Sequence, residues 1–303
     1  MIMGLERLDL DTPIDAFAPL VDGAYVDPVV TVRRVGRRDR RGRGIHTTSF
    51  DLHNRDARLE VRHCLPPEEL SNTLSVRLAS ELFETGWLRG STLFERIFTG
   101  IVRSFAEDPL DSWELFYRNT MAGRPTPPPG GGEDATLGPV HDHLHALLTE
   151  DTIGSVLDLA SCFGFLPLEL SARGFDVTAT DADADIVELL AAVAGRLRSE
   201  LRVDRVDARR LPYRDNSFDT VLALHLLEHL PPEDGESVVE QVIRVATRRA
   251  IIAVPFEDEP NESYGHLRTI ALSDLHRWGE RSGLPYHAYE HHGGWLIIDC
   301  GRS

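Results

Sequence analysis

The chain has 303 residues, enough for about two domains, and its 42% hydrophobic and 27% charged residues exclude a largely disordered protein. No run approaches 18 consecutive apolar residues and the charged N-terminal stretch lacks an apolar core, so we expect neither a transmembrane helix nor a signal peptide. All 32 basic residues are Arg, which excludes Schiff-base catalysis by lysine.

The net charge of −17 is unevenly distributed along the chain. Residues 1–130 carry 17 Arg and 19 acidic residues, net −2, whereas residues 131–303 carry 15 Arg and 30 acidic residues, net −15. An acidic half of that size would repel a phosphate backbone, so we expect no nucleic-acid partner. The cysteines Cys64, Cys162 and Cys300 form no CxxC pair, which favours a reducing, cytoplasmic location.

The first part of the chain, residues 1–123, is predicted to be an α+β module that caps or binds the acceptor. Extended segments are expected at 28–35, 44–52 and 57–64, with residues 53–56 turning the last two into a hairpin. Apolar spacing predicts helices over 67–121, including one at 92–105. Seven Arg between Arg33 and Arg43 could bind an anionic partner, but we interpret them as a solvated loop.

A linker is predicted at 124–132, where four prolines and three glycines can continue neither helix nor strand. Beyond it, residues 133–303 alternate between strands and helices. Strands are expected at 155–159, 176–180, 202–206, 218–224 and 249–254, followed by a hairpin of 286–290 and 295–299. This pattern predicts an α/β, doubly wound (Rossmann-like), mostly parallel seven-stranded sheet with an antiparallel C-terminal hairpin. His141 and His145 should share one face of a helix ahead of the first of these strands, away from His143.

A ligand site is predicted where the first strand of this sheet ends. Residues 156–164 (Val-Leu-Asp-Leu-Ala-Ser-Cys-Phe-Gly) read as a buried strand and a turn of small residues, with Pro167 in the first turn of the next helix. Such a turn lets backbone N–H groups approach a ligand at the carboxyl edge of the sheet. The second strand ends at Asp181, whose carboxylate can accept both hydroxyls of a ribose.

The spacing of small residues in this turn fits GxGxG, with Ala160, Cys162 and Gly164, better than the dinucleotide pattern GxGxxG, which would place Phe165 at its last position. This argues against a nicotinamide oxidoreductase. Here the sequence begins to resemble the class I S-adenosylmethionine-dependent methyltransferases. Residues 211–221 (Leu-Pro-Tyr-Arg-Asp-Asn-Ser-Phe-Asp-Thr-Val) and 224–230 (Leu-His-Leu-Leu-Glu-His-Leu) are similar to that family's approach to and exit from its fourth strand.

The resemblance implies S-adenosylmethionine as cofactor, with Asp181 at its ribose and Asp207 near its adenine. The cofactor-binding residues that it implies are Asp158, Ala160, Ser161, Cys162, Gly164, Asp181, Ala182, Asp207, Ala208 and Leu224. Two of the family's glycines are replaced by Ala160 and Cys162. Alanine at such a turn is acceptable if its φ stays negative.

Histidines at the carboxyl edge are the candidate bases for deprotonating an acceptor hydroxyl. They are His225 and His229 after the fourth strand and His266 after the fifth, with Glu228 as a fourth catalytic candidate. If residues 225–229 are helical, His225, Glu228 and His229 could hold a metal ion. Because the Glu-His pair occurs without metal in the family that the chain resembles, we expect no metal.

Arg268 and Trp295 are predicted to bind the acceptor, although core packing is the ordinary role of a tryptophan. A closer resemblance rests on residues 63–72, on the Ala-Ser-Cys-Phe-Gly turn, and on residues 264–269 with 291–295. These passages are similar to the mycofactocin oligosaccharide methyltransferases, which implies O-methylation of a hydroxyl on the glucose chain of a peptide-derived redox cofactor. The implied partner is thus a glycosylated small-molecule acceptor, with no nucleic acid and no membrane; the sequence leaves the oligomeric state open.

Two alternatives remain open at the level of sequence. The acceptor could instead be another small molecule or a lipid. The chain could also be a non-catalytic binding protein with the same fold, in which Ala160 and Cys162 mark lost catalysis.

Overall fold

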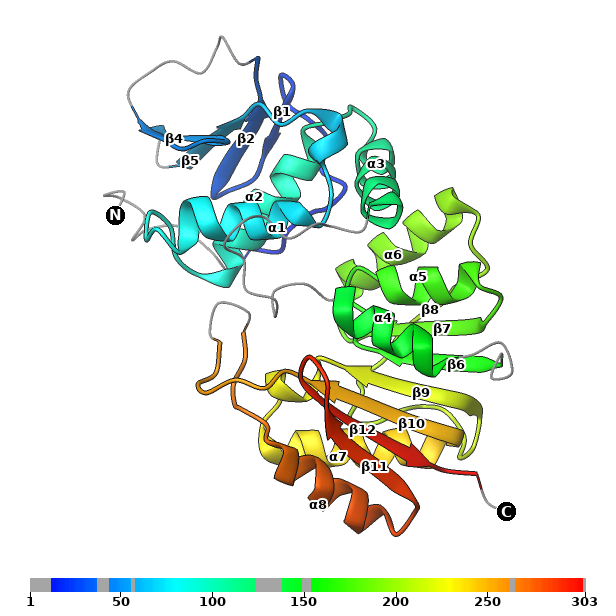
Figure 1. Ribbon diagram of the computed structural model, residues 1–303. Helices are drawn as coiled ribbons and strands as arrows, with labels where there is room; N and C mark the ends of the chain where they lie inside the picture. The colour runs from blue at the N-terminus through cyan, green and yellow to red at the C-terminus, as the bar shows by residue number, and fades with distance from the viewer. Residues whose placement is uncertain are drawn as a thin grey trace. The chain divides into compact units, whose positions relative to one another are not determined.

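The computed structural model describes residues 12–36, 44–55, 58–123, 138–148, 154–261 and 265–301. The chain divides into two compact units, Met1–Ala135 and Thr136–Ser303 (Figure 1). The predicted linker at 124–132 and most of the Arg-rich run lie outside the described residues. Among the described helices, none is both long and apolar enough to cross a membrane.

The N-terminal unit contains a five-stranded sheet with the order β1-β2-β5-β4-β3. Its strands are β1 (Ala24–Val26), β2 (Val30–Arg34), β3 (Ile45–His46), β4 (Phe50–Arg55) and β5 (Arg58–His63). Its helical elements are η3 (Pro67–Glu69), α1 (Thr73–Leu78), the π-helical turn η4 (Ala79–Phe83), α2 (Ser91–Arg103) and α3 (Pro109–Ala122). The helical region predicted over 67–121 is therefore confirmed, as several shorter elements.

The strand expected at 44–52 is wrong, because the chain turns between β3 and β4. Thr47 and Ser49 form that turn, and both donate hydrogen bonds to the carboxylate of Glu81. The Phe50 N–H also donates to the Thr47 hydroxyl, at 3.0 Å. The predicted pairing of the two strands does form, but β4 continues to Arg55, so residues 53–55 are strand and not turn.

Gly100 lets α2 lie directly against the N-terminal sheet. A Cβ at this position would lie 2.8 Å from Tyr25 Cδ1 and closer still to Val32 Cγ2. We therefore expect Gly100→Val to destabilise this unit by about 2 kcal/mol, the middle of the range for overpacked cores. Amide hydrogen exchange of α2 would measure the change.

A matched control for this prediction is Gly195 in α6 of the other unit, since a Cβ there would meet nothing within 4 Å. Gly195→Ala should stabilise its own unit by about 0.5–1 kcal/mol, because alanine favours helix over glycine. Wild-type exchange rates in α2 of Gly100→Val would contradict the close packing of α2 on β2.

The C-terminal unit contains a seven-stranded sheet with the order β11-β12-β10-β9-β6-β7-β8. Its strands are β6 (Ser155–Leu159), β7 (Asp176–Asp181), β8 (Arg202–Arg205), β9 (Phe218–Leu224), β10 (Ala246–Val254), β11 (Tyr286–Glu290) and β12 (Gly294–Asp299). β12 runs antiparallel to both β10 and β11, while β6 to β10 are parallel. The predicted fold class is thus confirmed, and most strand boundaries agree to within one residue.

The helices of this unit are α4 (Gly138–Leu147), α5 (Phe165–Ala172), α6 (Ala184–Leu197), the 3₁₀ turn η7 (Leu227–His229), α7 (Pro232–Val245) and α8 (Leu272–Ser282). Helices α5 and α6 lie with β6–β8, and α7 and α8 with β9–β12 (Figure 1). The chain extends the sheet from β6 in one direction and from β9 in the other, so the order reverses between these two strands. Ligands bind at the carboxyl ends of the strands beside such a reversal.

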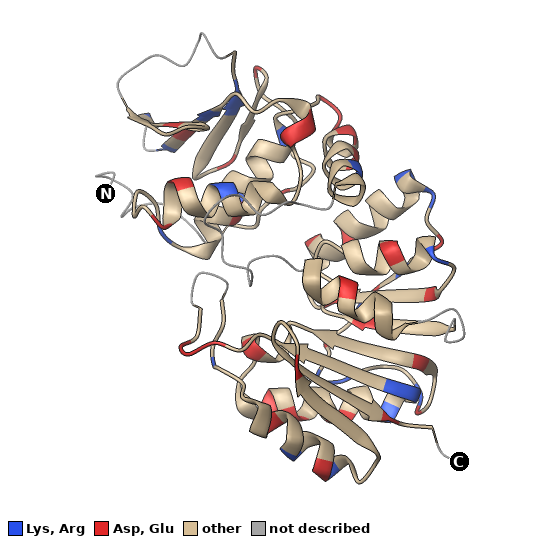
Figure 2. Ribbon diagram, viewed as in Figure 1, with Lys and Arg blue, Asp and Glu red and all other residues tan. Residues whose placement is uncertain are grey.

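The start of β6 is tied to its neighbour β9 by the aspartate of the Ser-Phe-Asp segment. The Ser155 N–H and hydroxyl both donate to Asp219 Oδ2, at 2.9 and 3.0 Å. The acidic residues of this unit are coloured at separate positions along several of its helices and strands (Figure 2).

Candidate active site

The turn after β6 adopts left-handed backbone at alternate positions. The φ angles are +54° at Ala160, +49° at Cys162 and +70° at Gly164. The Ser161 N–H donates to the Thr180 carbonyl of β7 at 2.8 Å, and the Gly164 N–H donates to the Ser161 carbonyl at 2.7 Å. The condition under which alanine would fit this turn without strain, a negative φ, is therefore not met at Ala160, because these bonds hold the backbone in a conformation that favours glycine.

Gly164 itself has little room for a side chain, because a Cβ there would run into the Leu190 side chain of α6. Phe165 begins α5, and Pro167 occupies its first turn as predicted. The turn therefore presents backbone to the carboxyl edge of the sheet, as a closely bound ligand requires.

Asp181, the last residue of β7, faces this turn. Its Oδ2 accepts the Cys162 N–H at 3.1 Å and its Oδ1 accepts the Asp183 N–H at 3.0 Å. Each carboxylate oxygen has a further lone pair for a ligand hydroxyl. The carboxylate is therefore held in place before any ribose binds.

Asp158 lies inside β6 and is only 4% exposed. Burial raises the pKa of Asp158 to about 6, although the Ser161 hydrogen bond opposes this. The carbonyl of Asp158 accepts hydrogen bonds from the hydroxyls of Ser161 and Thr180. Asp158 therefore supports the turn through its carbonyl, while its carboxylate is buried inside the unit.

The remaining predicted cofactor residues lie at the ends of their strands. Ala182 follows β7, and Leu224 ends β9. Asp207 and Ala208 follow β8, but the Asp207 carboxylate is already paired with the Arg209 guanidinium at 2.7 Å. The hydrogen bonds from Arg209 hold the pKa of Asp207 below its usual range. An adenine amino group would have to share this carboxylate with Arg209.

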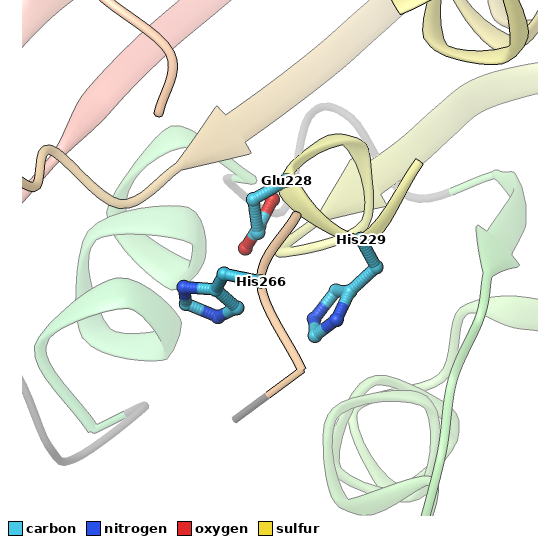
Figure 3. A group of neighbouring side chains, drawn as sticks. All are labelled: Glu228, His229 and His266. Carbon is cyan, nitrogen blue, oxygen red and sulfur yellow. The ribbon is translucent and has the colours of Figure 1, made fainter. Parts of the chain in front are cut away.

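The four predicted catalytic residues come together at the carboxyl ends of β9 and β10. Glu228 and His229 are in η7, and His266 comes from the segment after β10 (Figure 3). The rings of His229 and His266 are 4.9 Å apart between centroids. His225 has φ +51°, which turns the chain at the end of β9 and places its Nδ1 3.3 Å from Glu228 Oε1.

Sequence reasoning missed Glu257, which accepts a hydrogen bond from His266 Nδ1 at 2.7 Å. The available signal was its place three residues after the end of β10, at the edge where ligands bind. It also missed Glu169 of α5. His141 and His145 share a helix face, as predicted, and both contact the Glu169 carboxylate. Burial raises the pKa of Glu169, but the hydrogen bonds from the two histidines lower it by more, to about 2.

The two predicted acceptor-binding residues are placed differently from that expectation. The Trp295 side chain is fully buried, its N–H donates to the His291 carbonyl, and its ring packs on His143. A buried ring offers no face to a sugar, which argues against acceptor binding. Arg268 is half-buried, its Nε donates to the Leu227 carbonyl at 3.2 Å, and it fills space left by Gly235. It packs between η7 and α7.

Comparison with known proteins identifies the region that contains this site. Residues 156–248 match a family model described as a methyltransferase domain. Ajmaline N-methyltransferase of Rauvolfia serpentina is 34% identical over 86 residues, which are 28% of this chain and 28% of that protein. Norajmaline N-methyltransferase of the same plant is 38% identical over 63 residues, 21% of each chain. The match thus spans less than a third of these relatives.

Solved structures with similarity to this chain cover about half of it. The PH0226 protein from Pyrococcus horikoshii has a TM-score of 0.45 and 18% identity, over 56% of this chain and 94% of its own. Magnesium protoporphyrin IX methyltransferase from Synechocystis, solved with bound S-adenosylmethionine, has a TM-score of 0.42 and 21% identity, over 53% of this chain and 76% of its own. The turn after β6, Asp158, the strands β7 to β9 and all but the first residue of β6 lie within residues 156–248, the region that matches the methyltransferase-domain model.

Proposed function

We propose that this protein is an S-adenosylmethionine-dependent O-methyltransferase that acts on a hydroxyl of a glycan, the oligoglucoside of the redox cofactor mycofactocin. The assignment as a methyltransferase rests on one observation: the turn that would hold the cofactor and the cluster that would act on the acceptor lie at the same edge of the sheet. The turn 160–164 follows β6, and the cluster of Glu228, His229 and His266 follows β9 and β10. These three strands are neighbours in the sheet, so a bound methyl donor and an acceptor would meet at one edge.

The residues present fit the cofactor. When bound, S-adenosylmethionine supplies a methyl group on a sulfonium whose sulfur leaves as a neutral thioether. The turn 160–164 offers backbone N–H groups at close approach, and the preset Asp181 carboxylate would accept the ribose hydroxyls. Asp207 would contact the adenine in exchange with Arg209.

The protein's part in the chemistry is to align the acceptor hydroxyl and take its proton. Methyl transfer is an in-line displacement, for which orientation and exclusion of water are the main requirements. A histidine at this edge accepts the proton, because imidazole is the side chain that most often serves as a general base. The glycan acceptor is supported by the resemblance of residues 63–72, 264–269 and 291–295 to the mycofactocin enzymes. We also place the reaction in the cytoplasm, where unpaired cysteines are typical.

The test uses the purified full chain, deuteromethyl-labelled S-adenosylmethionine and a small-molecule extract that contains glycosylated peptide cofactors. Mass spectrometry should find the label on a hexose. Label on an amine or on a lipid would keep the methyltransferase and discard the glycan; the amine outcome would agree with the activity named for the two plant relatives. Bound cofactor without any transfer would instead favour a binding protein.

A further inference from the structure

Three potential ligand groups converge at the end of β9. One ligand atom each from Glu228, His229 and His266 lies within 4.8 Å of the other two. Two of them come from η7 and the third from the segment after β10, and Figure 3 shows their side chains facing one another. Ligand atoms around a tetrahedral ion with bonds of about 2.0–2.1 Å are separated by about 3.3 Å, so small side-chain rotations would close the site.

The carboxylate of Glu228 is the second observation that points to an ion. Glu228 is 1% exposed, and within the described residues neither of its oxygens has a hydrogen-bond partner. The His225 Nδ1 is close, at 3.3 Å, but without hydrogen-bond geometry. His225 can offset the charge of this carboxylate only when it is protonated, and a buried carboxylate that accepts no hydrogen bond is unfavourable, so this position favours a bound cation.

Arg268 does not supply that charge through a hydrogen bond. Its Nε donates to the Leu227 carbonyl, and its Nη2 is itself buried without a partner in the described part of the chain. A hydrogen bond between the Arg268 guanidinium and the Glu228 carboxylate would satisfy Nη2 and one of the two carboxylate oxygens, and all three of these atoms are without a partner in the described residues. Arg268 therefore interacts with Glu228 only at longer range and leaves both carboxylate oxygens open to a ligand ion.

The two histidines are oriented as metal ligands usually are. His266 Nδ1 donates to the Glu257 carboxylate at 2.7 Å, and His229 Nδ1 donates to the Gly265 carbonyl at 3.3 Å. With the proton on Nδ1 in both rings, the lone pair is on Nε2. An outer carboxylate or carbonyl that fixes the tautomer in this way is a recurrent feature of histidine metal ligands.

We propose that Glu228, His229 and His266 bind a divalent transition-metal ion of the Zn²⁺ type, and that the open coordination position takes the acceptor hydroxyl. Two imidazoles and a carboxylate with an open position form the ligand set of catalytic zinc sites. This replaces the expectation of no metal, which rested on resemblance alone. The proposed role rests on the proposed function, whereas the metal site itself does not.

The ion changes which histidine acts as the base. Bound to such an ion, the acceptor O–H would ionise more easily, and its proton would pass to His225, which lies beside Glu228 and is not one of the three ligands. The oxygen lone pair then forms the new bond to the methyl carbon while the carbon–sulfur bond breaks, and its electron pair goes to sulfur. Charge balances, because the sulfonium becomes neutral and the proton is on the histidine.

The test measures metal binding by the full chain directly. Protein stripped with a chelator and dialysed is titrated with Zn²⁺ by calorimetry, and Co²⁺ is added separately to follow the visible absorption of a coordinated ion. We expect one ion per chain. Glu228→Gln should weaken binding by more than the about 10–100-fold that loss of an outer-shell partner costs, and Glu257→Gln should fall within that range.

Two further measurements guard against misfolded variants. Without metal, the melting temperature of Glu228→Gln should be no lower than that of wild type, because the variant removes a buried carboxylate that accepts no hydrogen bond. Addition of Zn²⁺ should raise the melting temperature of wild type but not that of the variant. The matched control is His276→Gln in α8, an exposed histidine outside the cluster, which should bind the ion like wild type.

Equal Zn²⁺ affinity of wild type and Glu228→Gln, or no ion bound by wild type, would overturn the metal site. Binding of S-adenosylmethionine is measured on the same samples. Cofactor binding and methyl transfer without an ion would discard this inference and keep the proposed function. An ion at the site without cofactor binding would keep the metal site and discard the methyltransferase.

Discussion

Replacing Asp181 with Ala is expected to weaken S-adenosylmethionine binding by about 1.5–3 kcal/mol, a roughly 10- to 150-fold rise in Kd. The variant loses the carboxylate that would accept the ribose hydroxyls. It also releases the Cys162 N–H, which Asp181 Oδ2 accepts at 3.1 Å. Both losses weaken binding of the same cofactor, because one carboxylate holds the turn at Cys162 and would accept the ribose hydroxyls. Isothermal calorimetry with S-adenosylmethionine and with its demethylated product measures the change.

Asp183→Ala provides the matched control for this prediction. The Asp183 side chain caps α6 by accepting the N–H groups of Asp185 and Ile186. Its loss should lower stability by about 1 kcal/mol and leave the Kd unchanged. Asp181→Asn, which keeps one acceptor oxygen, should lie between wild type and Asp181→Ala. Wild-type affinity in Asp181→Ala would place the cofactor elsewhere on the sheet.

The strands of the C-terminal unit were predictable because their signal is local. β6 and β9 are runs of buried apolar residues, and each is followed by residues that break a strand. Right-handed parallel connections then leave few ways to arrange such an alternation. The same local signal located the edge where the turn 160–164, Asp181 and the histidines lie.

The features that sequence could not provide depend on residues distant in the chain. The turn at Thr47 exists because Glu81, 34 residues away, accepts its hydroxyl. The positive φ of Ala160 depends on β7, whose Thr180 carbonyl holds the next N–H. The burial of Glu228 likewise depends on packing that no spacing in residues 224–230 reveals.

The stability of wild type relative to an Asp158→Asn variant is expected to fall by about 3 kcal/mol in total as the pH rises from below about 3 to above about 7, with about 2 kcal/mol of that fall between pH 4 and 6. The folded-state pKa of Asp158 is raised by burial to about 6, against 3.8 for the ordinary side chain. Between these values the folded protein holds a proton that the unfolded chain has released, so raising the pH disfavours folding. Below the lower value both states are protonated, and above the higher value both are ionised.

The difference between the two proteins isolates this one carboxylate, because every other titrating group is common to both. The free energy of unfolding of the C-terminal unit is measured at several pH values from amide hydrogen exchange in β6 and β7, which separates it from the N-terminal unit. A constant offset between the proteins reports only how asparagine fits at this site. The fall between pH 4 and 6 reports the titration.

The outcome bears on the ligand site as well as on stability. Asp158 supports the turn 160–164 through its carbonyl, which accepts the Ser161 and Thr180 hydroxyls, so its ionisation at neutral pH places an unfavourable charge directly under the turn. If the free-energy difference is flat across this pH range, the carboxylate must be better solvated than its 4% exposure implies, and the turn would be more open to water. If the difference falls as expected, this unit gives up part of its stability to keep a buried, ionised carboxylate next to the turn 160–164.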